Sequence, residues 1–142
     1  MGRTYWYECE RCGYRAKVSG KADRGLSFAV QTILCQDCKR LYDAVTRLRV
    51  PDESPLSDWR NTSGLRRLEW ARLDHKPARP PTFDTVLNLL PTTGARRFVW
   101  LQYKPQCPVS PYHKVKNWNQ PCECPVCGVQ LERSALPFRI WE

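Results

Sequence analysis

The chain has 142 residues with 8 cysteines, 12 prolines and 6 tryptophans, and its formal net charge at pH 7 is +9. A hydrophobic content of 42% with 11% aromatic residues is too high for a disordered chain, and the length suits one domain or two very small ones. No apolar run approaches the roughly 20 residues of a membrane span, and the first residues lack the apolar core of a signal peptide. We therefore expect a folded cytoplasmic protein without a membrane partner.

Alternation of apolar and polar residues predicts antiparallel strands in the first fifty residues. The alternating segments are residues 5–9, 14–18, 28–34 and 42–50. The two glycines of the segment Ser19 to Gly25 predict the loop of a hairpin. The last segment also has apolar residues at helical spacing (Leu41, Val45 and Leu48), so a helix stays open as the alternative there.

The rest of the chain predicts short, separate elements. Residues 59–73 and 83–90 favour helices, the second capped by Thr82, and three prolines make residues 74–81 irregular. Residues 98–103 predict a strand that leads to a second group of cysteines. The apolar tail over residues 136–141 is expected to dock as a terminal strand or to await a partner.

Two C-x-x-C pairs in the first fifty residues indicate a metal site. The pairs are Cys9 with Cys12 and Cys35 with Cys38, and Gly13 after the first pair suits a tight turn. Zn²⁺ prefers four tetrahedral ligands, and each short turn directs two thiolates to one point. Without an export signal the thiols are expected to stay reduced, which favours zinc over disulfides. The spacing predicts a four-cysteine zinc site.

A second zinc site is predicted near the end of the chain. Cys124 and Cys127 form another C-x-x-C pair, and Cys107 and His113 supply two further ligands at plausible loop lengths. Cys122 is the alternative to His113, although its place two residues before Cys124 crowds the turn. We therefore expect two Zn²⁺ per chain.

These paired cysteines resemble the zinc-ribbon class of domains, in which two C-x-x-C turns on β-hairpins hold one metal. The resemblance implies a small, zinc-stabilised, mainly antiparallel β fold, to which the composition adds a partly helical middle. The expected division is a four-cysteine ribbon over residues 1–50, a Pro-rich linker with short helices over 51–96, and a Cys3His ribbon-like module over 97–142. Such domains serve nucleic-acid binding and protein docking alike.

The positive charge is concentrated in the first fifty residues, which hold ten Lys and Arg against five Asp and Glu. Aromatic residues lie between these cations, and single-strand-binding proteins combine cations for phosphates with aromatic rings for base stacking. The pattern predicts contact with DNA or RNA through the N-terminal ribbon. The candidate residues are Arg11, Arg15, Lys17, Lys21, Arg24, Lys39 and Arg40.

The sequence favours a non-catalytic accessory protein, because both zinc sites use all four ligands and leave no open position for substrate. The alternative is an adaptor subunit of a larger complex, indicated by the many tryptophans and the apolar tail. A remote alternative is a metal-dependent nuclease of the HNH type, because Asp74, His75 and Asn88 resemble elements of that motif. The zinc deaminase pattern is absent, because no glutamate follows His113 at the required spacing.

Overall fold

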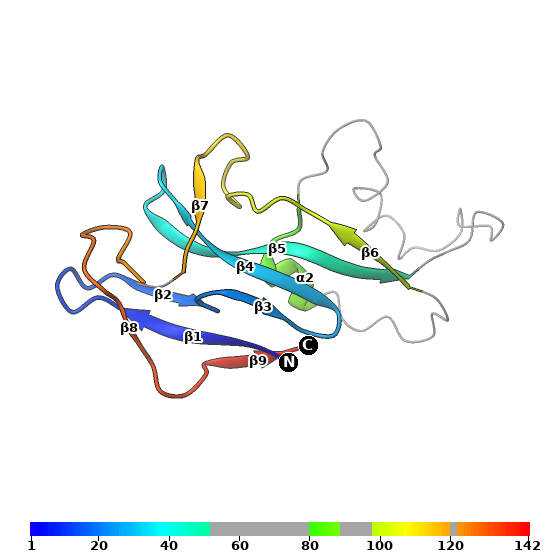
Figure 1. The fold of residues 1–142 in the computed structure, drawn as a ribbon, viewed down its shortest axis with the longest axis horizontal. Coiled ribbons are helices and arrows are strands. Elements are labelled where there is room, and N and C mark those ends of the chain that lie inside the picture. Colours follow the sequence, from blue (N-terminus) through cyan, green and yellow to red (C-terminus); the bar gives the residue numbers. More distant parts are fainter. Residues whose placement is uncertain (52–79, 89–97, 120–121) are drawn as a thin grey trace.

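The computed structural model describes residues 1–51, 80–88, 98–119 and 122–142, and Figure 1 shows their arrangement. These residues form short strands and one helix, α2, in a fold that is mostly antiparallel β. The strands are Gly2–Glu8 (β1), Arg15–Val18 (β2), Ala22–Arg24 (β3), Phe28–Cys35 (β4), Arg40–Pro51 (β5), Phe98–Gln102 (β6), Val115–Asn117 (β7), Glu132–Arg133 (β8) and Arg139–Trp141 (β9).

The strands form two antiparallel sheets. In the four-stranded sheet β2 pairs with β1, while β9 pairs with the first half of β1 and β8 pairs with its last residues. In the five-stranded sheet the order is β3-β4-β5-β6, and β7 pairs with the end of β4. Strands that follow residue 97 therefore pair with strands that precede residue 52 in both sheets, and the two chain termini lie side by side (Figure 1).

Strand β5 settles the open choice between strand and helix over residues 42–50. Its register with β4 shifts between Ala29 and Val30, which leaves Thr46 as an extra residue in β5. Such a bulge reverses the alternation of side chains along a strand. Leu41 and Val45 are buried before the bulge and Leu48 after it. Three apolar residues at helical spacing therefore face the protein interior from one strand.

The segment predicted as a hairpin loop, residues 19–25, contains the short strand β3, so that prediction was wrong in part. Asp23 lies opposite Val30, and its carboxylate also accepts a hydrogen bond from the backbone N–H of Arg3. Gly20 precedes this strand at a φ of 84°, and a Cβ atom there would overlap the hydroxyl of Tyr7. Glycine is required at this turn for both reasons.

Helix α2 (Phe83–Asn88) confirms the short helix predicted after Thr82. The Thr82 hydroxyl accepts a hydrogen bond from the backbone N–H of Thr85, as expected of a residue that caps a helix. The helix expected over residues 59–73 lies outside the described residues. The fold is therefore β with one six-residue helix in its described part, and a partly helical middle is not supported beyond α2.

The apolar interior consists of two clusters. The first surrounds the end of β1 and contains Tyr7, Cys9, Ala16, Val18, Leu41, Trp118, Cys124 and Leu131. The second lies between β4, β5, α2 and the chain end, and contains Phe28, Val30, Val45, Leu48, Val50, Val86 and Trp141. Because both clusters combine residues from the start and the end of the chain, their burial holds these two parts together.

The apolar tail docks as a terminal strand, which is the first of the two alternatives that the sequence left open. Strand β9 pairs with β1, and its residue Trp141 is 4% exposed. The Trp141 ring stacks on Phe28 with 4.3 Å between ring centroids and meets Phe83 edge-on at 5.6 Å. A Cβ atom at Gly2 would overlap the Trp141 ring, so the small residue at the start of β1 makes room for the indole.

Candidate metal centres

The first metal centre consists of Cys9, Cys12, Cys124 and Cys127, whose four sulfur atoms all lie within 4.8 Å of one another. The Cys9 and Cys127 sulfurs are 3.4 Å apart, and the Cys12 and Cys124 sulfurs are 3.6 Å apart. A tetrahedral zinc ion with metal–sulfur bonds of about 2.3 Å has sulfur–sulfur distances of about 3.8 Å. The group therefore fits one Zn²⁺.

The second metal centre consists of Cys35, Cys38, Cys107 and His113, grouped within the same limit. The Cys38 and Cys107 sulfurs are 3.7 Å apart, and the His113 Nδ1 atom lies 3.3 Å from the Cys38 sulfur and 3.6 Å from the Cys35 sulfur. Zinc bound to one imidazole and three thiolates has nitrogen–sulfur distances of about 3.6 Å. This group fits a second Zn²⁺.

Two of the three turns that carry C-x-x-C pairs share one backbone hydrogen-bond pattern. After the first pair, the Cys9 N–H donates to the Tyr14 carbonyl and the Gly13 N–H to the Cys9 carbonyl, and Gly13 has a φ of 74°. The pair ending at Cys127 repeats this pattern, with Gly128 at a φ of 77°. Gly13 therefore serves the tight turn predicted for it.

Lys39 takes the position after Cys38 that glycine takes in the other two turns. Its φ is 52°, a left-handed value that is uncommon outside glycine, asparagine and aspartate. The Cys38 N–H donates to the Cys35 sulfur across this turn at 3.3 Å. A residue with a positive φ thus follows all three C-x-x-C pairs.

All eight predicted ligands occur in the two centres, but the predicted pairing was wrong. The sequence grouped Cys9 and Cys12 with Cys35 and Cys38, whereas each centre combines an N-terminal pair with ligands from after residue 97. Strand pairing is the physical reason. Strand β8, which follows the Cys127 turn, pairs with β1 just before Cys9.

The second centre is joined in the same way. Val115 of β7 lies opposite Cys35, and the Gln36 N–H donates to the Lys114 carbonyl. The Lys114 N–H in turn donates to the Asp37 carboxylate. These three contacts hold His113 beside the turn that carries Cys35. The spacing of cysteines along the sequence cannot predict such contacts.

One thiol in each centre has a pKa near neutrality. The pKa of Cys9 is lowered to about 7, mainly by the backbone N–H of Cys12, which stabilises the thiolate. Burial raises the pKa of Cys107, but the backbone N–H groups of Ser110 and Val109 and the His113 ring outweigh it and lower that pKa to about 7. Zinc binds thiolates, so each centre has a ligand that ionises readily near pH 7.

Cys122 lies outside both groups, and His113 takes the fourth position of the second centre. The Cys122 backbone has a φ of 61°; its N–H donates to the Asn119 carbonyl, and its own carbonyl accepts from Leu131. Burial raises the pKa of the Cys122 thiol. Its role in the described structure is to shape the turn before Cys124.

Replacing His113 with alanine is expected to lower the zinc content from two ions per chain toward one, because three ligands hold the metal much less tightly than four. Cys122→Ser should keep both ions. Metal analysis after exposure to a competing chelator measures the difference, and His113→Cys, which restores a fourth ligand, should recover the second ion. Loss of an ion from the Cys122→Ser protein would contradict this ligand assignment.

The seven candidate nucleic-acid-binding residues are all exposed, but their side chains have different partners. Arg15 forms an ion pair with Glu8 at 2.6 Å. The Lys17 Nζ atom lies over two rings, 4.6 Å from the centroid of Trp6 and 4.2 Å from that of Phe138. Arg24 belongs to the five-stranded sheet and lies over the Trp100 ring of that sheet. The remaining four are Arg11, Lys21, Lys39 and Arg40, near the metal-binding turns and the start of β3.

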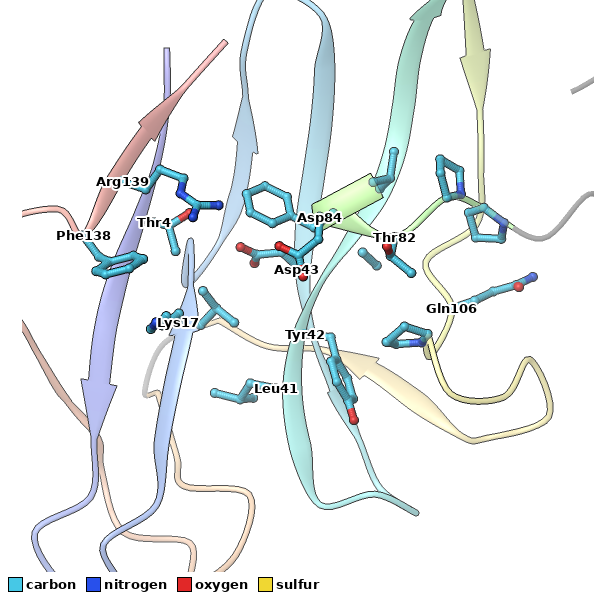
Figure 2. A pocket seen from close by; sticks show the side chains of 17 residues that line it. Thr4, Lys17, Leu41, Tyr42, Asp43, Thr82, Asp84, Gln106, Phe138 and Arg139 are labelled. Atoms are coloured by element: carbon cyan, nitrogen blue, oxygen red, sulfur yellow. The ribbon is translucent and has the colours of Figure 1, made fainter. Parts of the chain in front are cut away.

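A groove of about 470 Å³ runs between the four-stranded sheet and β5 (Figure 2). Lys17, Phe138 and Arg139 line one wall together with Thr4, whose hydroxyl is buried without a hydrogen-bond partner. Of these wall residues, the sequence indicated only Lys17 as a candidate for nucleic-acid binding. Phe138 and Arg139 come to lie near it only because β9 pairs with β1. This wall combines two cations, an aromatic ring and an unpaired hydroxyl.

The opposite wall of the groove is acidic, with Asp43 and Asp84 (Figure 2). Burial raises the pKa of Asp43 to about 6, although its carboxylate accepts hydrogen bonds from Thr32 and Ser19. The groove thus has one wall with cationic side chains and one wall with carboxyl groups.

No family model, no curated protein and no solved structure matches this chain. The two four-ligand centres within a mostly antiparallel β fold are consistent with the zinc-ribbon-like class. Among the described residues no helix is long and apolar enough to cross a membrane. Of the residues that resembled an HNH motif, Asp74 and His75 lie outside the described residues, and Asn88 is the exposed last residue of α2.

Proposed function

We propose that this protein is a non-catalytic, zinc-stabilised accessory protein that contacts nucleic acid through the cationic and aromatic surface of its four-stranded sheet. The observation that carries the proposal is the position of the Lys17 ammonium group over both the Trp6 and the Phe138 ring, at the edge of the groove. A cation beside partly exposed rings offers a phosphate contact and a stacking surface in one place.

The strands keep these groups together. Trp6 lies directly opposite Lys17 in the pairing of β1 with β2, and its ring meets that of Phe138 edge-on at 5.6 Å. Arg139 follows on β9 and lines the same groove wall. The groove wall thus combines Lys17 of the N-terminal ribbon with Arg139 from the end of the chain, which supports a cationic surface there.

The net charge stays positive when zinc is counted. Four thiolates with one Zn²⁺ carry −2, and three thiolates with one Zn²⁺ carry −1, which reduces the formal charge of +9 to about +6. Between described residues, Arg15 with Glu8 is the one ion pair, so most described cations stay available for phosphates.

The ligand sets of the metal centres support the non-catalytic part of the proposal. Each group supplies four protein ligands, and a tetrahedral zinc ion that is saturated in this way has no position for water or substrate. The absence of disulfides among the eight cysteines, all of which the structure describes, suits a reducing compartment and supports the cytoplasmic location that we propose.

The zinc-loaded protein is expected to bind labelled single-stranded oligonucleotides with an affinity that falls linearly with salt on logarithmic axes, because phosphate contacts release bound counterions. Lys17→Glu should weaken binding by about tenfold, since it reverses a phosphate contact, which costs roughly 1.4 kcal/mol. Lys104→Glu, an equal charge change at an exposed residue away from Trp6, is the control. Fluorescence anisotropy across a salt series measures both.

Absence of salt-dependent binding to any DNA or RNA would refute the proposal. It would then favour the second candidate, an adaptor within a protein assembly. That alternative is supported by the exposed apolar side chains of the C-terminal segment, of which Leu136 is 79% and Ile140 54% exposed. Aromatic and apolar residues of this kind are typical of protein interfaces.

A further inference from the structure

The outer face of the five-stranded sheet carries arginine and aromatic side chains that serve neither metal centre. In antiparallel pairs, residues directly opposite one another point to the same face. Arg24 of β3 and Arg47 of β5 flank Ala29 of β4 in one row. Arg49, two residues after Arg47, lies opposite Trp100 of β6 in the next row. Strand order therefore places cations from separate parts of the chain on one face.

Each of these guanidinium groups lies over an aromatic ring. Arg24 and Arg47 are 5.4 Å and 5.3 Å from the centroid of Trp100, and Arg49 is 3.8 Å from that of Phe98. Contact with a ring restricts the long arginine side chain and keeps its charge on this face. We call these five residues the arginine–tryptophan face. Only Arg24 among them was expected from the sequence to bind nucleic acid.

The guanidinium groups of this face form no ion pair within the described part of the chain, and the neighbouring Asp23 carboxylate accepts only the backbone N–H of Arg24 and that of Arg3. The Nε atom of Arg47 is buried without a hydrogen-bond partner. Three like charges gathered in this way repel one another, and a bound anion relieves the repulsion. The charge of the face is complementary to a polyanion.

The arginine–tryptophan face lies on the side of β5 opposite the second apolar cluster. The opposite side of the same strands carries Phe28 and Leu48, which are 0% and 4% exposed and lie opposite one another. Trp100 and Arg47 stay partly exposed, and Arg24 is exposed beside the methyl groups of Ala22 and Ala29. The aromatic and cationic groups are therefore not needed to fill the interior between the sheets.

We propose that the arginine–tryptophan face binds single-stranded nucleic acid, with backbone phosphates on the guanidinium groups and an unpaired base stacked on Trp100 or on a guanidinium plane. Unpaired bases offer flat surfaces to aromatic rings and arginine, whereas a duplex keeps those surfaces stacked inside. The inference rests on the proposed function, to which it adds a second surface and a preference for single strands.

The test compares single-stranded RNA, single-stranded DNA and duplex DNA of about 12 nucleotides per strand, a length comparable to known single-strand site sizes. The variant Arg24→Gln/Arg47→Gln/Arg49→Gln should bind single strands at least about tenfold more weakly and lower the logarithmic salt slope by about 2, at roughly 0.7 per phosphate contact. The control is Lys104→Gln/Lys114→Gln/Lys116→Gln, which removes equal charge at exposed lysines and should change affinity less than about threefold. RNA and DNA arms show which strand chemistry is bound.

A second variant separates stacking from charge. Trp100→Leu keeps every cation, and it should weaken single-strand binding by about fivefold or more, because stacking on an aromatic ring stabilises each bound base. Duplex binding by the same variant should stay unchanged. Zinc content of two ions per chain confirms the fold of each variant; if the triple variant fails this check, Arg24→Gln, which alters one exposed side chain, replaces it.

The outcomes distinguish the two proposals. A wild-type protein that binds no nucleic acid overturns both. Binding that is lost in Lys17→Glu but equal in the triple variant and its lysine control overturns the arginine–tryptophan face and leaves the proposed function standing. Duplex binding as tight as single-strand binding, with no effect of Trp100→Leu, overturns the preference for single strands.

Discussion

Removing zinc is expected to unfold both sheets together and not to release one end of the chain. Each centre joins residues from before residue 40 to residues from after residue 105, so each bound ion closes a long loop. Structural zinc sites contribute on the order of 10 kcal/mol each, which is as large as the whole stability of a typical domain. A strong chelator should abolish the near-ultraviolet circular dichroism and most of the β signal, in parallel with metal release. Retained β structure in metal-free protein would contradict this expectation.

Double substitutions test which ligands share an ion. Cys12→Ser with Cys127→Ser removes two ligands of the first centre, so the protein should still bind one zinc. Cys12→Ser with Cys38→Ser disables one ligand of each centre and should weaken both ions. Grouping by neighbouring cysteines predicts the reverse order of effects. Metal analysis in the presence of a competing chelator therefore distinguishes the two arrangements directly.

Trp141→Ala is expected to lower the free energy of unfolding by about 3–5 kcal/mol, the usual cost of removing a buried aromatic ring. The Trp141 side chain fills the second apolar cluster between Phe28 and Phe83. Its loss leaves a cavity under β9 and weakens the pairing of β9 with β1. Urea unfolding of the zinc-loaded protein, followed by circular dichroism, gives the value.

Two matched variants identify the cause of that loss. Ile140→Ala changes an exposed residue of the same strand and should cost less than about 1 kcal/mol. Trp141→Phe keeps a ring against Phe28 and removes the indole N–H, which is buried without a hydrogen-bond partner, so its cost should be smaller than that of alanine. Equal losses for Ile140→Ala and Trp141→Ala would show that the strand, and not the ring, carries the stability.

Local chemistry made the metal ligands predictable from the sequence. A C-x-x-C turn needs only neighbouring residues, so Cys9 with Cys12 and Cys124 with Cys127 could be identified without knowing the fold. Which turns share an ion depends on strand pairing between distant parts of the chain, since Cys9 and Cys127 are 118 positions apart and Cys38 and Cys107 are 69 positions apart. Single-sequence periodicity contains no signal for such pairing.

Features that sequence patterns left open or missed have equally specific causes. Residues 42–50 were predicted as a strand, but the bulge at Thr46 kept a helix open as the alternative, because it inserts one residue into an alternating pattern. The arginine–tryptophan face was missed because Arg47 and Trp100 become neighbours only when β6 pairs with β5. Strands with clear alternation, such as β2, were correctly predicted because one face of each is buried.

The interleaved centres have a consequence for the order in which the protein is made. Cys9, Cys12, Cys35 and Cys38 leave the ribosome together, at least 69 residues before Cys107. These four thiols alone satisfy the chemistry of one zinc ion, so the nascent chain can form a closed, non-native centre. Reaching the native pairing from such a centre requires ligand exchange, so we expect the free zinc concentration during synthesis to affect the folding yield.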